Sequence, residues 1–160
     1  MADQTDQSQQ QLQDDPQIVE FGGESFVAKL FHYVLNFALP GTGNPESISQ
    51  SLQIDSDSDF QLIMLMGSRT SPLATVEVYE SSAGGLAWQS NPVNIDNFLG
   101  TAQLPFPAGL IPQLMPKKRA YNVKVTSTSG AANTVQIDFW GYKLYPAAQA
   151  AQLGATPSTS

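Results

Sequence analysis

With 160 residues and a hydrophobic content of 41%, the chain can bury the core of one domain, and the absence of cysteine excludes disulfides and thiolate metal sites. Charged residues make up only 13% of the chain, against an ordinary share of about 25%, which fits a protein covered by neighbours and also fits some secreted β-proteins. The net charge is −7, and the one basic cluster, Lys117 to Arg119, is too short to indicate a nucleic-acid partner; we interpret it as a solvated or salt-bridging turn.

Two low-complexity regions are predicted at the ends of the chain. Residues 1–24 form an acidic, Gln-rich N-terminal arm with six acidic residues and no Lys or Arg, so the remaining chain has a net charge near −1. Residues 146–160 form an uncharged tail rich in Ala, Gln and Ser. Neither region has enough apolar residues to fold alone. The first residues lack the basic and apolar segments of a signal peptide, so we expect synthesis in a cytoplasm.

The body of the chain, residues 25–145, has the residue pattern of β-strands. Strands are predicted over residues 26–35, 48–54, 60–66, 74–79, 121–126 and 135–144, although a short helix is an alternative for the first of these. Turn-forming residues separate them at 40–45, 81–85 and 129–133. The last spacer is short enough to predict an antiparallel hairpin. The pattern therefore predicts an all-β fold, an antiparallel β-sandwich or jelly roll with extended N- and C-terminal arms.

Residues 91–116 are predicted to form a long Pro-rich loop within this body. The uncharged stretch 97–116 contains four prolines, which excludes a membrane-spanning helix, so no membrane partner is expected. Its apolar side chains would make too large a patch on a free monomer. The loop therefore either folds back over the core or packs on another subunit, and we favour the subunit contact. The expected interaction residues are Phe98, Leu99, Leu104, Phe106, Leu110, Ile111, Leu114 and Met115.

No set of catalytic side chains is apparent in the sequence. The single histidine, His32, lies in an apolar strand, and we interpret it as a packed or interface residue. There is no GxSxG motif and no phosphate-binding Gly loop before a helix. Glu77 and Glu80 are predicted on opposite faces of a strand, so they would not form the carboxylate pair of a glycosidase. We therefore predict no enzymatic activity and no cofactor.

Three aspartates, Asp55, Asp57 and Asp59, form a DxDxD string like the beginning of a calcium-binding loop. Phe60 stands where an EF-hand loop needs Gly, and Met66 stands where it needs the bidentate Glu. The three aspartates are therefore weak candidates for a hard cation. The alternative is a solvated turn between two strands.

Two tryptophans and two tyrosines are candidates for stacking on a sugar ring. They are Trp88, Trp140, Tyr79 and Tyr142. Aromatic residues in a β-protein more often belong to the core or to an interface, so a carbohydrate-binding module is only an alternative function.

The order of segments over residues 26–145 resembles small β-sandwich virion proteins of tailed bacteriophages. An acidic turn leads into a buried strand (IDSDSDFQLIML), a Pro-rich segment follows (LPFPAGLIPQLMPKKR), and then comes the predicted hairpin YNVKVTSTSGAANTVQIDFWGYKLY. The resemblance is strongest in the ending, SGAANTV followed by FWGYKL. It implies a non-enzymatic protein of the virion that binds the major capsid protein or other virion proteins. It carries over no functional residues, because surfaces perform the task.

From this resemblance we expect a capsid cement or decoration protein that forms a homo-oligomer, with a trimer as the expected size. A position in the neck, the tail or a fibre base is the alternative within the virion.

Overall fold

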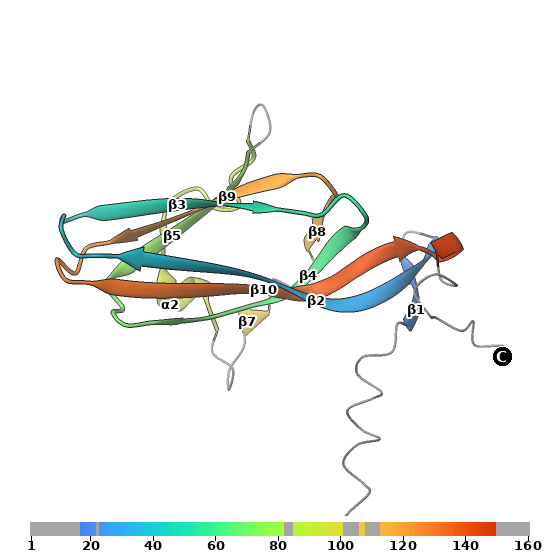
Figure 1. Cartoon of the computed structure of the whole chain (residues 1–160), viewed down its shortest axis with the longest axis horizontal. Helices are drawn as coiled ribbons and strands as arrows, with labels where there is room; N and C mark the ends of the chain where they lie inside the picture. The colour runs from blue at the N-terminus through green and yellow to red at the C-terminus, as the bar shows by residue number, and fades with distance from the viewer. Residues whose placement is uncertain (1–16, 22, 82–84, 101–105, 108–112, 150–160) are drawn as a thin grey trace, which may run out of the picture.

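The computed structural model describes residues 17–21, 23–81, 85–100, 106–107 and 113–149. These residues form two antiparallel sheets packed face to face, so the predicted all-β sandwich is confirmed (Figure 1). The large sheet contains β1 (Gln17–Phe21), β2 (Glu24–Leu39), β10 (Asn133–Pro146) and β4 (Asp59–Arg69) in this order, and the short strands β7 (Phe106–Pro107) and β8 (Gln113–Met115) pair with β4. The small sheet contains β3 (Glu46–Gln53), β9 (Ala120–Ser127), β5 (Ala74–Glu80) and β6 (Val93–Asn94) in this order. One short helix, α2 (Ile95–Phe98), follows β6.

The core lies between the two sheets and follows from the alternation of apolar residues along each strand. The segment 26–35, for which a helix was the alternative, is part of the 16-residue strand β2. The buried residues include Leu35, Phe37, Leu39, Val76, Val78, Val123, Val125, Val135, Ile137 and Phe139. Burial of each such side chain contributes about 1.5–3 kcal/mol, so this alternation is the main force that holds the sheets together.

The predicted hairpin of the last two strands is wrong. β9 belongs to the small sheet and β10 to the large sheet, so the turn between them crosses from one sheet to the other. The turn between β4 and β5 makes the same crossing beside it. The two crossings are joined by main-chain hydrogen bonds from Thr70 to Thr134 (3.0 Å) and from Thr128 to Leu73 (2.9 Å). A short turn sets the direction of the next strand, but it does not determine which sheet that strand joins.

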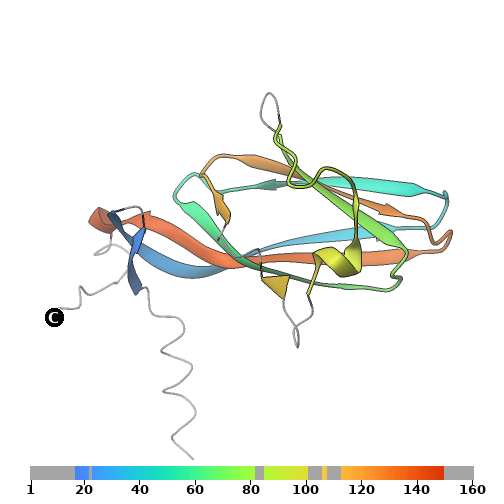
Figure 2. The same ribbon diagram turned by 180° about the vertical axis from the view of Figure 1, so that it is seen from behind.

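Strands β2 and β10 extend beyond the sandwich as a twisted ribbon, and β1 pairs with β2 at its far end (Figures 1 and 2). Part of the predicted N-terminal arm is therefore a strand, and residues 1–16 lie outside the described residues. β10 pairs with β2 without interruption, whereas its pairing with β4 shifts by one residue between Trp140 and Gly141. The shift leaves Ile63 as the extra residue of a β-bulge in β4.

Strand β10 ends at Pro146, and residues 150–160 of the predicted tail lie outside the described residues. Within the part of the chain that the structure describes, no helix has the length and apolar character needed to cross a membrane.

Candidate functional site

The Pro-rich segment 91–116 folds against the core over its described residues. Ile95 and Met115 have no exposed surface, and Phe98 and Leu99 pack half-buried against the core. The expectation that Met115 is exposed for contact with another subunit is therefore wrong. The physical reason is that β8 pairs with β4 and turns Met115 toward the space between the sheets.

The remaining expected interaction residues divide into two groups. Leu114 is half-buried at the rim of the cavity described below. Leu104, Leu110, Ile111 and the side chain of Phe106 lie outside the described residues.

A cavity of about 700 Å³ opens beside this segment, between β4 of the large sheet and β5 of the small sheet. Its lining includes Leu62, Leu65, Leu86, Trp88, Phe98, Leu114 and Tyr121, with the polar residues Glu80, Gln89, Asn97 and Gln113. The Trp88 ring makes edge contacts with the rings of Tyr121 and Phe139, at centroid distances of 5.7 and 6.2 Å. Trp88 is thus a packing residue that also forms part of the cavity wall.

The aspartate string is tied to a buried lysine. Lys143 lies on β10 with its side chain 8% exposed, and its Nζ is 2.6 Å from Asp55 Oδ2 and 3.5 Å from Asp57 Oδ1. Asp59 is turned elsewhere and accepts a hydrogen bond from the Lys117 main-chain N–H (2.8 Å). Among the described residues, no three acidic or histidine side chains are placed to hold a metal ion. Asp55, Asp57 and Asp59 are therefore explained by an ion-pair cluster and a turn.

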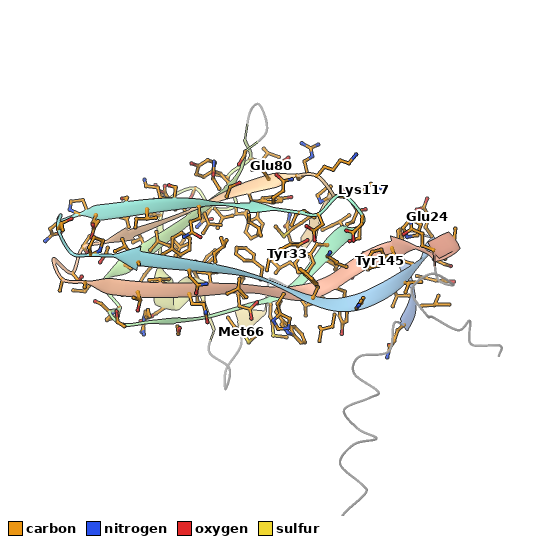
Figure 3. The ribbon with its side chains drawn as sticks, viewed as in Figure 1. Glu24, Tyr33, Met66, Glu80, Lys117 and Tyr145 are labelled. Atoms are coloured by element: carbon orange, nitrogen blue, oxygen red, sulfur yellow. The ribbon has the colours of Figure 1, made fainter. Side chains whose placement is uncertain are left out.

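Two tyrosines and the ring of Phe31 complete this ion-pair cluster. Tyr33 and Tyr145 are labelled in Figure 3. Tyr33 donates to Asp55 (3.2 Å), Tyr145 donates to Asp57 (3.3 Å), and the Lys143 ammonium lies 4.3 Å from the centre of the Phe31 ring. The cluster therefore joins the aspartate turn to β2 and β10.

The charges of the cluster stabilise one another. Burial lowers the pKa of Lys143, but the hydrogen bond to Asp55 and the neighbouring tyrosines outweigh this effect, so its pKa lies above the ordinary value. Burial raises the pKa of Asp57, but the hydrogen bond from Ser58 and the charge of Lys143 outweigh it, so its pKa lies below the ordinary value. Both groups are therefore charged at neutral pH.

The single histidine lies on the outer face of the large sheet, away from the small sheet. His32 Nδ1 is 3.0 Å from Asp138 Oδ2, and the His32 ring makes an edge contact with the Trp140 ring at 5.5 Å. The other carboxylate oxygen of Asp138 is buried and has no hydrogen-bond partner among the described residues. The residues beside Asp138 on the adjoining strands are Val34 and Met66, which supply no nucleophile. The structure thus places His32 in a surface pair with Asp138.

Apolar side chains gather around this pair on the same outer face. They are Leu30 and Val34 of β2, Trp140 and Tyr142 of β10, and Met64 and Met66 of β4, where Figure 3 labels Met66 on the side away from the small sheet. Val34 is 45% exposed and Tyr142 is 36% exposed. We call these six residues the apolar outer patch.

The outer face of the small sheet is polar by contrast. Ser47 bonds to Thr126 (2.8 Å), and Lys124 pairs with Glu77 (3.0 Å). The outer face of the large sheet therefore carries an apolar patch around a charged pair, whereas the outer face of the small sheet is polar. The sequence did not indicate this difference, because Leu30 and Val34 on the outer face lie among the inward-facing apolar residues of the same strand.

The other candidates from the sequence do not converge. Trp88 lines the cavity and Tyr79 lies on the small sheet, whereas Trp140 and Tyr142 lie together on the outer face of the large sheet, so the four do not form one sugar-stacking platform.

The basic cluster and the two strand carboxylates have structural partners. Arg119 pairs with Glu80 (2.7 Å), which confirms the salt-bridging turn expected for the basic cluster. Because Glu77 pairs instead with Lys124, the two glutamates have separate partners.

Comparison with known proteins gives little further information. No family model matches the chain, and no curated protein matches it. A chain from the structure of infectious bursal disease virus, Gx strain, is similar at 14% sequence identity and a TM-score of 0.25, over 86% of this chain and 48% of the virus chain. The chain thus spans about half the length of that virus protein. A likeness of this size supports no argument on function.

Proposed function

We propose that the chain is a non-enzymatic structural protein of a bacteriophage particle, most specifically a capsid cement or decoration protein that bridges subunits of the head shell. The observation that carries this proposal is the apolar outer patch. It lies on the outer face of the large sheet, around the pair of His32 and Asp138, whereas the outer face of the small sheet is polar. Contiguous apolar surface on a folded protein is typical of a site that another protein covers.

The composition of the patch supports a protein partner. Trp, Tyr and Met are enriched in protein interfaces, and tryptophan is among the residues whose loss weakens binding most. The patch brings Trp140, Tyr142, Met64 and Met66 together on neighbouring strands. We take the major capsid protein as the partner, and a neck, tail or fibre-base protein as the alternative, because both would use the same kind of face.

The experiment has two parts. Particles purified on a density gradient from cultures of the source organism are examined for the chain by mass spectrometry and by immunogold labelling. Labelling over the whole head supports the cement role, whereas labelling at one vertex or along the tail selects the alternative location. If purified particles lack the chain, the proposal is wrong.

The second part tests the patch itself by adding tagged chain to the purified particles. Trp140→Gln should weaken binding about 30-fold, the effect of losing about 2 kcal/mol at an interface hot spot. Tyr79→Gln, an aromatic change on the polar face of the small sheet, is the matched control and should bind normally. Equal binding by the Trp140 variant would contradict a role for the patch.

A carbohydrate-binding function is a second candidate, favoured by the 700 Å³ cavity with Trp88 and the amide side chains of Asn97 and Gln113. A pocket with an aromatic wall and a few polar groups is typical of small-molecule sites. Binding on a glycan array that is lost in Asn97→Leu and Gln113→Leu would support it. Absence of binding to every glycan would dismiss it.

A further inference from the structure

One edge of the large sheet is open over most of the length of β2. On one side β2 pairs with β10 from Phe26 to Leu39, and on the other side it pairs with β1 only from Glu24 to Ala28. Among the described residues, no strand pairs with residues 29–39 on that second side. Figures 1 and 2 show this part of β2 at the margin of the large sheet.

The main-chain groups that face this edge can be assigned. The side-chain amide of Gln50, on β3, donates to the Asn36 carbonyl, so this carbonyl points away from β10. In an antiparallel strand the N–H and C=O of one residue point the same way, and the direction alternates along the strand. The main-chain groups of Leu30, His32 and Val34 therefore face the same open edge as those of Asn36.

This edge lacks the features that prevent edge pairing in natural sheets. Such edges usually carry charged residues, proline or a bulge. Between Leu30 and Leu39 there is no Lys, Arg, Asp, Glu or Pro, and the register with β10 continues without a bulge. Val34 is 45% exposed beside the edge. The open edge of β3 is different, because it carries Glu46 at its end and exposed serines along its length.

We infer that two copies of this chain join edge to edge through β2, antiparallel and about a two-fold axis, so that the two large sheets become one. The partner is a second copy because an antiparallel strand pairs with itself: each free N–H meets a carbonyl of the same segment in the other copy. The inference rests on the proposed assembly role for its biological purpose.

The charges along the strand are compatible with this pairing. Lys29 is the only Lys or Arg in the open segment, and it lies at one end. A two-fold centre at Val34 would place the two lysines about 33 Å apart, at about 3.3 Å per residue. Because the Asn36 carbonyl of each copy already accepts from Gln50, the pairing would form about eight further main-chain hydrogen bonds, which is typical of a specific interface. It would also place the two apolar outer patches side by side, and it predicts even-numbered assemblies in place of a trimer.

The chain's own residues before Gln17 are the other possible occupant, because Gln17 pairs with Ala28, next to the start of the open segment. They include Asp14, Asp15 and Pro16, which are residue types that oppose strand pairing. A second copy of the chain is therefore the better candidate for the strand that pairs with this edge.

The test measures the mass of the purified full chain by light scattering across a concentration series. We expect twice the 17.2 kDa of the monomer. Val34→Lys, which places like charges near the axis, should raise the dissociation constant about tenfold or more. Ser49→Lys makes the same charge change on the open edge of β3 and should leave the dimer unchanged. If the Val34 variant does not fold, as judged by its circular dichroism spectrum, Asn36→Lys is a second substitution that places a lysine at the β2 edge.

Three results would overturn the inference. They are a monomer at every concentration, an odd-numbered oligomer, or equal weakening by the β2 and β3 variants. Deletion of residues 1–16 distinguishes the two possible occupants of the edge. Loss of the dimer on deletion would mean that these residues form the contact, whereas an unchanged dimer supports pairing through β2. A dimer that is absent from virus particles would contradict the proposed function alone, and a monomer present in particles would contradict this inference alone.

Discussion

Asn133 holds the two sheet crossings together, and its replacement tests the finding that the last turn crosses between sheets. Its side chain is buried, and the residue is 1% exposed. Oδ1 accepts hydrogen bonds from Thr70 Oγ1 and from the Ser71 main-chain N–H, both at 3.0 Å. Nδ2 donates to the Ser71 carbonyl (3.2 Å) and lies 3.5 Å from Ser127 Oγ. One side chain thus joins the β4–β5 crossing to the β9–β10 crossing.

Asn133→Ala should lower the free energy of unfolding by about 3 kcal/mol. The change removes three hydrogen bonds of good length, each with a net contribution of about 1 kcal/mol. For a chain of this size the loss corresponds to a fall in Tm of about 6–12 °C. The free energy is measured by urea unfolding, followed by tryptophan fluorescence and circular dichroism. A loss below about 0.5 kcal/mol would refute the reasoning, because the crossings would then be held by other contacts.

Asn133→Asp is the control that separates the acceptor from the donor. The aspartate can still accept from Thr70 and Ser71, but its second oxygen faces the Ser71 carbonyl instead of donating to it. Burial without a donor raises the pKa of this carboxyl in the folded state above its unfolded value. A group with a raised folded pKa stabilises most below its unfolded pKa, so the variant should gain stability relative to the original chain as pH falls from neutral toward the ordinary pKa of aspartate. Parallel pH profiles for the two proteins would contradict this account.

Three further changes test the packing and the ion-pair cluster. Gly141→Ala should destabilise by about 1–3 kcal/mol in urea unfolding, since its Cβ would clash with the Gln61 main-chain oxygen, whereas Gly43→Ala has its nearest contact at 3.4 Å and should cost little. Met115→Ala should lower the free energy of unfolding by about 2–5 kcal/mol because this side chain is fully buried. A near-neutral result would mean that Met115 is not part of the core. The lowered pKa of Asp57 means that its stabilisation is present above its ordinary pKa and is lost as pH falls through the folded value. Asp57→Asn should remove this part of the acid dependence, as measured by thermal unfolding at a series of acidic pH values.

Much of the fold could be predicted from local patterns. The strands around Val123 and Ile137 alternate buried and exposed residues, and that alternation depends only on the period of an extended chain. The length of β2 and the pairing of β1 could not be predicted in this way. One face of β2 packs in the core, and on the other face Leu30 and Val34 of the apolar outer patch alternate with His32 and Asn36, so the sequence lacks a clear period.

The candidate sites were predicted less well, because they depend on residues that are distant in sequence. The aspartate string suggested a cation, and its actual partner is Lys143, 88 residues after Asp55. His32 similarly meets Asp138, 106 residues away. No local motif links such pairs; only the pairing of β10 with both β2 and β4 brings them together.

The fold class, the turn positions and most inward-facing residues follow from the amino-acid sequence alone, since they depend on side-chain period and backbone preference within a few residues. The tertiary structure decided which sheet each strand joins, as β9 and β10 demonstrate. It also decided that Met115 is core and that the large sheet keeps an apolar face and an open edge at β2. The physical reason is that strand pairing and burial are set by the neighbours available in three dimensions, and the free energy of those contacts is shared among residues far apart along the chain.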